Sequence, residues 1–87
     1  EKYKMAFYPN PIKTIAIFEF ENLSEGELRI ELVDTKGSFV KEVYNRNNIS
    51  TGENKIKLNF DMVKSGQYYL IVYLNNEIRH NIKVIKE

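Results

Sequence analysis

The sequence predicts an all-β protein, folded as an antiparallel β-sandwich of about seven strands. Three observations support this prediction. Short segments alternate apolar and polar side chains, which is the pattern of strands with one buried face. Turns that contain glycine, asparagine or proline separate these segments at regular intervals. No stretch keeps the 3.6-residue apolar period of a helix long enough to form one.

The central element is predicted at residues 65–74, the longest apolar and aromatic run of the chain. Both of its sets of alternate positions are apolar, so we expect a strand in the middle of a sheet or covered on both faces. Gly66, at the start of this segment, suits a tight corner. In immunoglobulin-like sandwiches a tyrosine shortly after such a corner bonds the backbone upstream, and Tyr68 and Tyr69 are the candidates here.

The first half of the chain contains three more predicted strands. Residues 2–8 form an edge strand that ends at a rigid turn, Pro9-Asn10-Pro11, because two prolines fix the backbone on either side of Asn10. Residues 14–21 are rich in β-branched and aromatic side chains and form the second strand. Residues 27–33 alternate regularly, which indicates a half-buried strand, and Asp34-Thr35-Lys36-Gly37 follows as a hairpin turn with Gly37 left-handed.

The segment after this turn predicts a strand, a loop and a second strand. Residues 39–44 return as the partner strand, and the polar residues 45–48 form a surface loop. Ile49 then plugs the edge of the core. A turn that contains Gly52 leads into the strand at residues 55–60.

The last predicted strand covers residues 77–86, after a turn at Asn75-Asn76. Its alternation predicts one side facing the core and the other facing solvent. Expected on the core side are Ile78, His80, Ile82 and Val84; expected on the other are Arg79, Asn81 and Lys83.

Composition limits the classes of protein. At 87 residues we expect one domain, residues 1–87. Thirteen basic and twelve acidic side chains give a net charge of +1, which does not fit a basic nucleic-acid binder. The absence of cysteine excludes a disulfide framework and a thiolate metal site. The first residues lack a signal-peptide pattern, so we expect a fragment of a larger exported protein whose targeting segment lies elsewhere.

Reactive groups are few, and we expect no enzyme, no cofactor and no small-molecule substrate. The single histidine, His80, lies on the apolar side of its strand, where packing is a commoner role than catalysis. Asp34 and Asp61, the only aspartates, fall at turns or strand ends, without the spacing of an acid/base pair or a metal site. The serines fall in turns outside any nucleophile motif.

Five short motifs occur in a specific order along the chain. They are Tyr8-Pro9-Asn10-Pro11, the strand from Leu28 that ends in Asp34-Thr35-Lys36-Gly37, Gly52-Glu53-Asn54, Ser65-Gly66-Gln67-Tyr68, and the terminal Lys83-Val84-Ile85-Lys86. This order resembles the type A C-terminal sorting domain of the type IX (Por) secretion system, over nearly the whole chain from Tyr8. The sequence departs from that pattern at Val63-Lys64, where Leu-Pro is usual, and at the final Glu87.

The resemblance implies an immunoglobulin-like fold at the end of a larger protein exported by a Gram-negative bacterium. It implies passage through the periplasm, recognition by the translocon and shuttle proteins, and arrival at the cell surface or outside the cell. It also implies removal of the domain by a sortase-like peptidase and attachment of the cargo to surface lipopolysaccharide, or its release. The signal positions carried over are Pro9, Asn10, Pro11, Asp34, Gly37, Gly52, Gly66, Tyr68, Lys83, Val84, Ile85 and Lys86.

The last strand also has physical features of a recognition element. Arg79, Lys83 and Lys86 are expected to form a basic outward stripe, and a terminal strand can offer an unpaired backbone edge to a receptor strand. Arg79 and the terminal residues Lys83, Val84, Ile85 and Lys86 are therefore the candidate translocon contacts. An ordinary edge strand protected by lysines is the alternative, and weak pairing of two copies through strand edges is also open.

Two other function classes fit the composition. A carbohydrate-binding or adhesin module would use an exposed aromatic platform such as Tyr3, Tyr44 and Tyr73. A structural module would brace a neighbouring catalytic domain through an apolar patch near the N-terminus.

Overall fold

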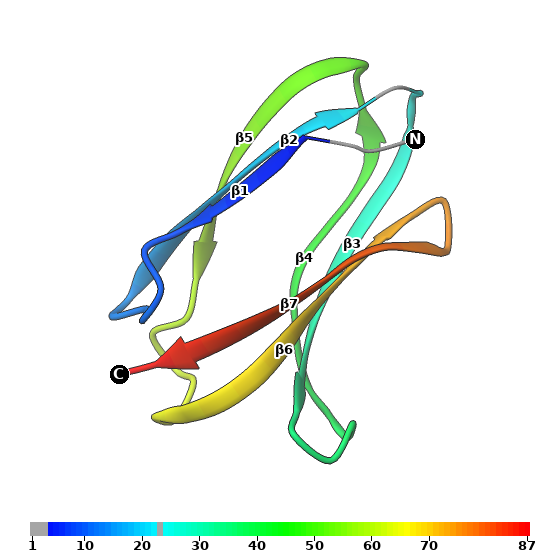
Figure 1. Cartoon of the computed structure of the whole chain (residues 1–87). Helices are drawn as coiled ribbons and strands as arrows, with labels where there is room; N and C mark the ends of the chain where they lie inside the picture. The colour runs from blue at the N-terminus through cyan, green and yellow to red at the C-terminus, as the bar shows by residue number, and fades with distance from the viewer. Residues whose placement is uncertain (1–3, 23) are drawn as a thin grey trace.

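The computed structural model describes residues 4–22 and 24–87, and within them it contains seven strands in two antiparallel sheets (Figure 1). The first sheet has the order β1-β2-β5, and the second has the order β4-β3-β6-β7. The predicted all-β sandwich is confirmed. The strands are β1 (Met5–Tyr8), β2 (Ile15–Asn22), β3 (Gly26–Asp34), β4 (Phe39–Ile49), β5 (Gly52–Asn59), β6 (Gly66–Leu74) and β7 (Glu77–Lys86).

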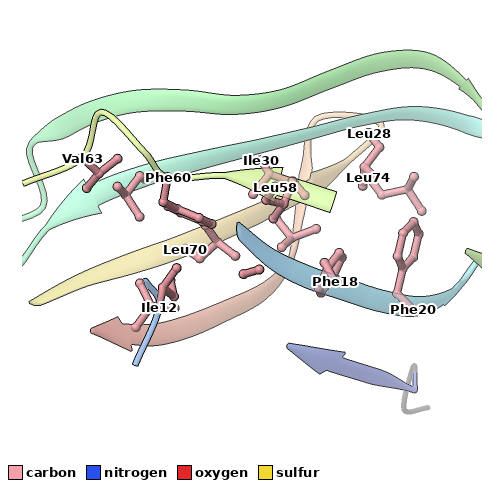
Figure 2. Packing of buried hydrophobic residues seen from close by; sticks show 14 of the residues in the cluster. Ile12, Phe18, Phe20, Leu28, Ile30, Leu58, Phe60, Val63, Leu70 and Leu74 are labelled. Carbon is pink, nitrogen blue, oxygen red and sulfur yellow. The ribbon is translucent and has the colours of Figure 1, made fainter. Parts of the chain in front are cut away.

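The core lies between the two sheets and is built from alternate residues of the inner strands (Figure 2). In β2, Phe18 and Phe20 point inward two residues apart, and their rings stack at a centroid distance of 5.0 Å. Phe60 is buried after β5 and meets the Phe7 ring edge-on at 6.3 Å. Each fully buried large apolar side chain stabilises the fold by roughly 1.5–3 kcal/mol. The period-two alternation of the sequence therefore supplies the core directly.

Strand β6 lies in the middle of the second sheet, between β3 and β7, as its two apolar faces predict. Its inner residues, Leu70, Val72 and Leu74, are buried in the core. On the outer face the Arg29 guanidinium lies 4.1 Å from the centre of the Tyr73 ring. Neighbouring side chains therefore cover much of the outer face without a third layer.

The turns predicted at residues 34–37 and at Asn75-Asn76 are confirmed, whereas the turn predicted around Gly52 is shorter than expected, because β5 already begins at Gly52. Asp34 Oδ1 accepts from the backbone N–H groups of Lys36 and Ser38, both at 2.9 Å, and Gly37 has φ of 87°. Asn75 and Asn76 have φ of 52° and 67°, which asparagine tolerates better than most residues.

The start of β3 faces this second turn closely, and its residue 26 is a glycine. A Cβ atom on Gly26 would lie 2.2 Å from the side-chain oxygen of Asn75. That oxygen accepts a hydrogen bond from the N–H of Glu27 at 2.9 Å. The lack of a side chain at Gly26 therefore lets the β6–β7 turn bond the start of β3.

The corner before β6 is held by a tyrosine, as predicted. The Tyr68 hydroxyl donates to the Lys64 carbonyl oxygen at 2.8 Å. Tyr68 packs against the core, whereas Tyr69 lies on the opposite face of β6 because side chains alternate. The structure thus decides between the two candidates.

The loop predicted at residues 45–48 is wrong, because β4 continues through them to Ile49. Asn45 and Arg46 pair with Arg29 and Leu28 of β3. A strand at the edge of a sheet can keep polar side chains in water along much of its length, so polarity gave a false loop signal. Ile49 is buried, as expected.

The prediction of which side chains of the last strand face the core is wrong at the start of the strand. The register shifts by one residue, because His80 pairs with Val72 but Ile78 pairs with Tyr73. Arg79 is the extra residue of this β-bulge. Ile78 therefore lies on the outer face, 61% exposed, while His80 remains on the inner side.

No helix able to span a membrane is found in the described part of the chain.

Candidate recognition site on the C-terminal strand

Strand β7 is the outermost strand of the second sheet (Figure 1). It pairs on one side with β6, with Val84 opposite Tyr68 and Ile82 opposite Leu70. A strand in this position has backbone N–H and C=O groups on its other side that no further strand of its sheet satisfies.

The last part of that outer edge is covered by residues 10–12, which we call the hook. The Ile12 N–H donates to the Ile85 carbonyl oxygen at 2.7 Å, and the Glu87 N–H donates to the Ile12 carbonyl oxygen at 2.8 Å. Ile12 and Lys86 thus form a single parallel bridge. The Ile12 side chain is 0% exposed and belongs to the core. The expectation of an unpaired backbone edge is therefore wrong for these last residues.

The side chain of Asn10 extends this coverage. Its Nδ2 donates to the Lys83 carbonyl oxygen, and its Oδ1 accepts from the Ile85 N–H, both at 3.0 Å. A side-chain amide carries the same donor and acceptor as a peptide group, so Asn10 takes the place of a neighbouring strand. The peptide bonds before Pro9 and Pro11 are both cis. The predicted rigid turn also joins the start of the chain to its last strand.

The expected basic stripe does not form on one face. Lys86 is 9% exposed, lies on the inner side with Val84, and its Nζ donates to the Glu87 carbonyl oxygen at 3.1 Å. Arg79 forms an ion pair with Glu77 at 3.5 Å and lines a hollow beside His80 near the other end of the strand. Alternation places Lys86 opposite in direction to Lys83, and the bulge turns Arg79 inward.

The candidate contacts at the end of β7 therefore differ in access. Lys83 is exposed, and Ile85, two residues on, is 41% exposed on the same outer face. Val84 is buried in the core. A partner can reach Lys83 and Ile85 on the folded domain, whereas Val84 and Lys86 become accessible only if the strand separates.

Four of the five motifs predicted from the sequence meet at one end of the sandwich. Gly66 pairs with Lys86, and Tyr68 lies between Val84 on one side and Asp34 on the other. The hook, which Pro9 directly precedes, lies against the same end of β7, and the turn at Gly37 follows Asp34. Gly52, with φ of 101°, pairs with Asn22 at the opposite end of the first sheet and does not join this group.

The single histidine, His80, lies near the opposite end of β7, beside Arg79. The His80 ring meets Phe18 edge-on at 6.1 Å, and burial, followed by the positive charge of Arg79, lowers the pKa of His80. Neutral imidazole is therefore the favoured form at neutral pH. Within residues 4–22 and 24–87, no three His, Asp or Glu side chains are grouped so that they could hold a metal ion.

The aromatic platform of the carbohydrate-binding alternative is not assembled. Tyr44 pairs with the buried Ile30 and packs against the core, whereas Tyr73 lies on the outer face under Arg29. Tyr3 lies outside the described residues. The two tyrosines that the structure places are on opposite faces of one sheet.

Sequence reasoning missed the contacts of Asn10 and Ile12 with β7. The one local signal was Ile12 itself, an isolated apolar residue between Pro11 and Lys13 in a segment with no alternation. A buried side chain in a loop indicates that the loop packs on something, but the sequence does not say on what.

Comparisons with known proteins agree with this architecture. The chain covers 73% of a crystal structure of a Bacillus anthracis protein described as a lipoprotein, with all 87 residues aligned, a TM-score of 0.62 and 20% identity, which is a likeness of fold. A search of curated protein sequences finds no match. The family model of the secretion system C-terminal sorting domain matches residues 6–87. The chain therefore belongs to the family of C-terminal sorting domains of the type IX (Por) secretion system.

Proposed function

We propose that this domain is a removable secretion signal. The secretion machinery recognises it at the C-terminal end of β7 while the cargo is in the periplasm. After passage through the outer membrane, a sortase-like peptidase removes the domain, and the cargo is attached to the cell surface. Membership of the family implies the coarser steps, namely interaction with the type IX machinery and export to the surface or the extracellular space. Sorting domains of this family are in general not catalysts.

The observation that carries the proposal is the gathering of the sequence motifs around the chain end. The Gly66 corner, Tyr68 and the hook are far apart in the sequence, yet all lie beside the last residues of β7. The Asp34–Gly37 turn lies at the same end of the sheet, on the other side of β6. Turn residues that served only the fold could be spread over both ends of a sandwich. Their gathering supports a surface at this end that a receptor reads.

Within that surface we propose Lys83 and Ile85 as the residues that a receptor first contacts. Both are accessible on the folded domain and lie on one face, and the backbone bonds of Ile12 hold the strand that carries them in place. A charged side chain at such a site mainly sets the orientation and rate of association. Val84 and Lys86 act indirectly, by anchoring the strand in the core.

The test is a fusion of residues 1–87 to a fluorescent protein that is targeted to the periplasm. We expect surface or extracellular fluorescence in a type IX-competent bacterium and periplasmic retention in a translocon mutant. Retention in both strains, or export in both, would contradict the proposal. Mass spectrometry of the exported cargo checks the removal step, which predicts cargo without the domain.

A pair of charge variants tests the site. Lys83→Glu reverses the exposed charge at the end of β7, and we expect it to lower export. Lys57→Glu reverses a charge that is also exposed, on β5 in the other sheet, and serves as the control. Equal export of the two variants would remove Lys83 from the proposed site.

A further inference from the structure

The direction of the backbone groups of β7 follows from the hook contacts. The N–H and C=O of Ile85 both form hydrogen bonds with the hook, so both groups point away from β6. In an antiparallel pair this orientation alternates from residue to residue, so Asn81 and Lys83 also turn their N–H and C=O groups outward. The outer edge of β7 thus presents the backbone of Asn81, Lys83 and Ile85.

This edge has three consecutive parts. At its end, the Ile85 carbonyl and the Glu87 N–H are paired with the backbone of Ile12, whose side chain is buried. Next, the Lys83 carbonyl and the Ile85 N–H are paired with the side chain of Asn10, which is itself exposed. The remaining groups, at Asn81 and the Lys83 N–H, have no strand beside them in the described part of the chain.

We propose that the outer edge of β7 from Asn81 to Ile85 accepts an extended peptide segment of the secretion machinery as an added strand, and that the Asn10 side chain is the gate to it. This inference rests on the proposed function, and it specifies that the machinery binds β7 by strand addition. The occupant that fits is a strand with an acidic side chain to meet Lys83 and an apolar one beside Ile85, since these two side chains border the edge on its outer face.

The gate decides how long the added strand can be. With Asn10 in place, the edge offers only the Asn81 N–H, the Asn81 carbonyl and the Lys83 N–H. Rotation of the Asn10 side chain adds the Lys83 carbonyl and the Ile85 N–H without moving the main chain. Ile12 marks the far limit because its core contacts hold its backbone in place, and the bulge at Arg79 marks the near limit.

A proline at position 81 tests strand addition. Proline is tolerated on an edge strand where its missing N–H would face solvent, but it removes a donor that an added strand needs. In the export fusion we expect Asn81→Pro to lower translocon-dependent export about tenfold, because one bonding group of the added strand is left unpaired, while Asn81→Ala leaves it at the wild-type level. Equal export of the two variants overturns the inference.

The folding of these variants is checked by thermal unfolding. If Asn81→Pro unfolds well below Asn81→Ala, the same comparison is made with Lys83→Pro and Lys83→Ala, because the Lys83 N–H also faces outward. Equal export of that second pair overturns the inference in the same way.

Asn10→Ala tests the gate, and Asn54→Ala is its matched control. Asn54 also bonds two backbone groups through its side chain, the carbonyls of Ser50 and Gly52 at 3.1 and 3.2 Å, but at the start of β5 in the other sheet. For Asn10→Ala we expect the Ile85 amide to exchange hydrogen about 3–10-fold faster in the isolated chain, with export equal to or above the wild type. Unchanged exchange at Ile85, or export lost with Asn10→Ala alone, overturns the gate.

The two levels of the proposal fail in different ways. If the wild-type fusion shows no translocon-dependent export, the proposed function fails, and the edge inference fails with it. If wild type and Asn81→Ala are exported but Asn81→Pro is exported equally, only strand addition fails.

Discussion

Replacement of Ile12 by alanine is the sharpest test of how the hook is anchored. The Ile12 side chain is fully buried in the core, and its backbone forms two hydrogen bonds with the end of β7. Removal of a buried isoleucine side chain beyond Cβ costs about 2–5 kcal/mol. For a domain of this size, whose total stability is about 4–13 kcal/mol, that is a large fraction. A loss of about 2–3 kcal/mol corresponds to a fall in Tm of roughly 10–20 °C.

The assay is urea unfolding combined with amide hydrogen exchange, and Leu58→Ala is the control. Leu58 is equally buried but lies on β5, away from the hook. Both variants should lower the free energy of unfolding by similar amounts. Only Ile12→Ala should also open the chain end locally, so that the Glu87 amide exchanges faster than global unfolding accounts for. A cost below about 1 kcal/mol for Ile12→Ala, or equal Glu87 exchange in the two variants, would refute the anchoring role.

Three further predictions concern the corner, a turn and the histidine. Tyr68→Phe removes the bond to the Lys64 carbonyl and should cost about 0.5–1.5 kcal/mol by urea unfolding, while Tyr69→Phe on the outer face should be near neutral; equal costs would contradict the corner. Gly37→Ala should cost about 1–2 kcal/mol, because φ is 87° there and nothing lies near the added methyl, so the cost is conformational; an unchanged Tm would contradict it. Burial lowers the pKa of His80, so the stability that its neutral form contributes is present above its unfolded pKa of about 6.5 and lost as pH falls through the lower folded value. Wild type should therefore lose stability on acidification relative to His80→Phe, and parallel pH profiles would exclude this role.

The hook gives the domain a physical link between its first and last segments. Asn10 and Ile12 lie more than 70 residues from the groups they bond. Because these contacts close the terminal edge, they also protect it from pairing with other chains while the domain is folded. Part of this edge is covered only by the exposed side chain of Asn10. The edge is therefore protected in the free domain, but a partner strand that offers more backbone hydrogen bonds can displace Asn10.

The sequence by itself determined the class of fold and most of its elements. Alternation of apolar side chains placed the inner faces of β3 and of the second half of β7, because burial on one face of a strand has a period of two. Gly37, the Asn75-Asn76 pair and Gly66 located turns, because only certain residues suit those backbone conformations. The order of the motifs also identified the family.

Tertiary structure alone decided the arrangement of the candidate site. A one-residue bulge at Arg79 places Ile78 on the outer face instead of the core side. No local sequence pattern predicts such an inserted residue. The polar residues at the end of β4 form a strand because they pair with the backbone of β3. Asn10 meets β7 only because the two sheets bring the chain's first turn beside its last strand, and a hydrogen bond between a side chain and a distant backbone leaves no periodic trace in the sequence.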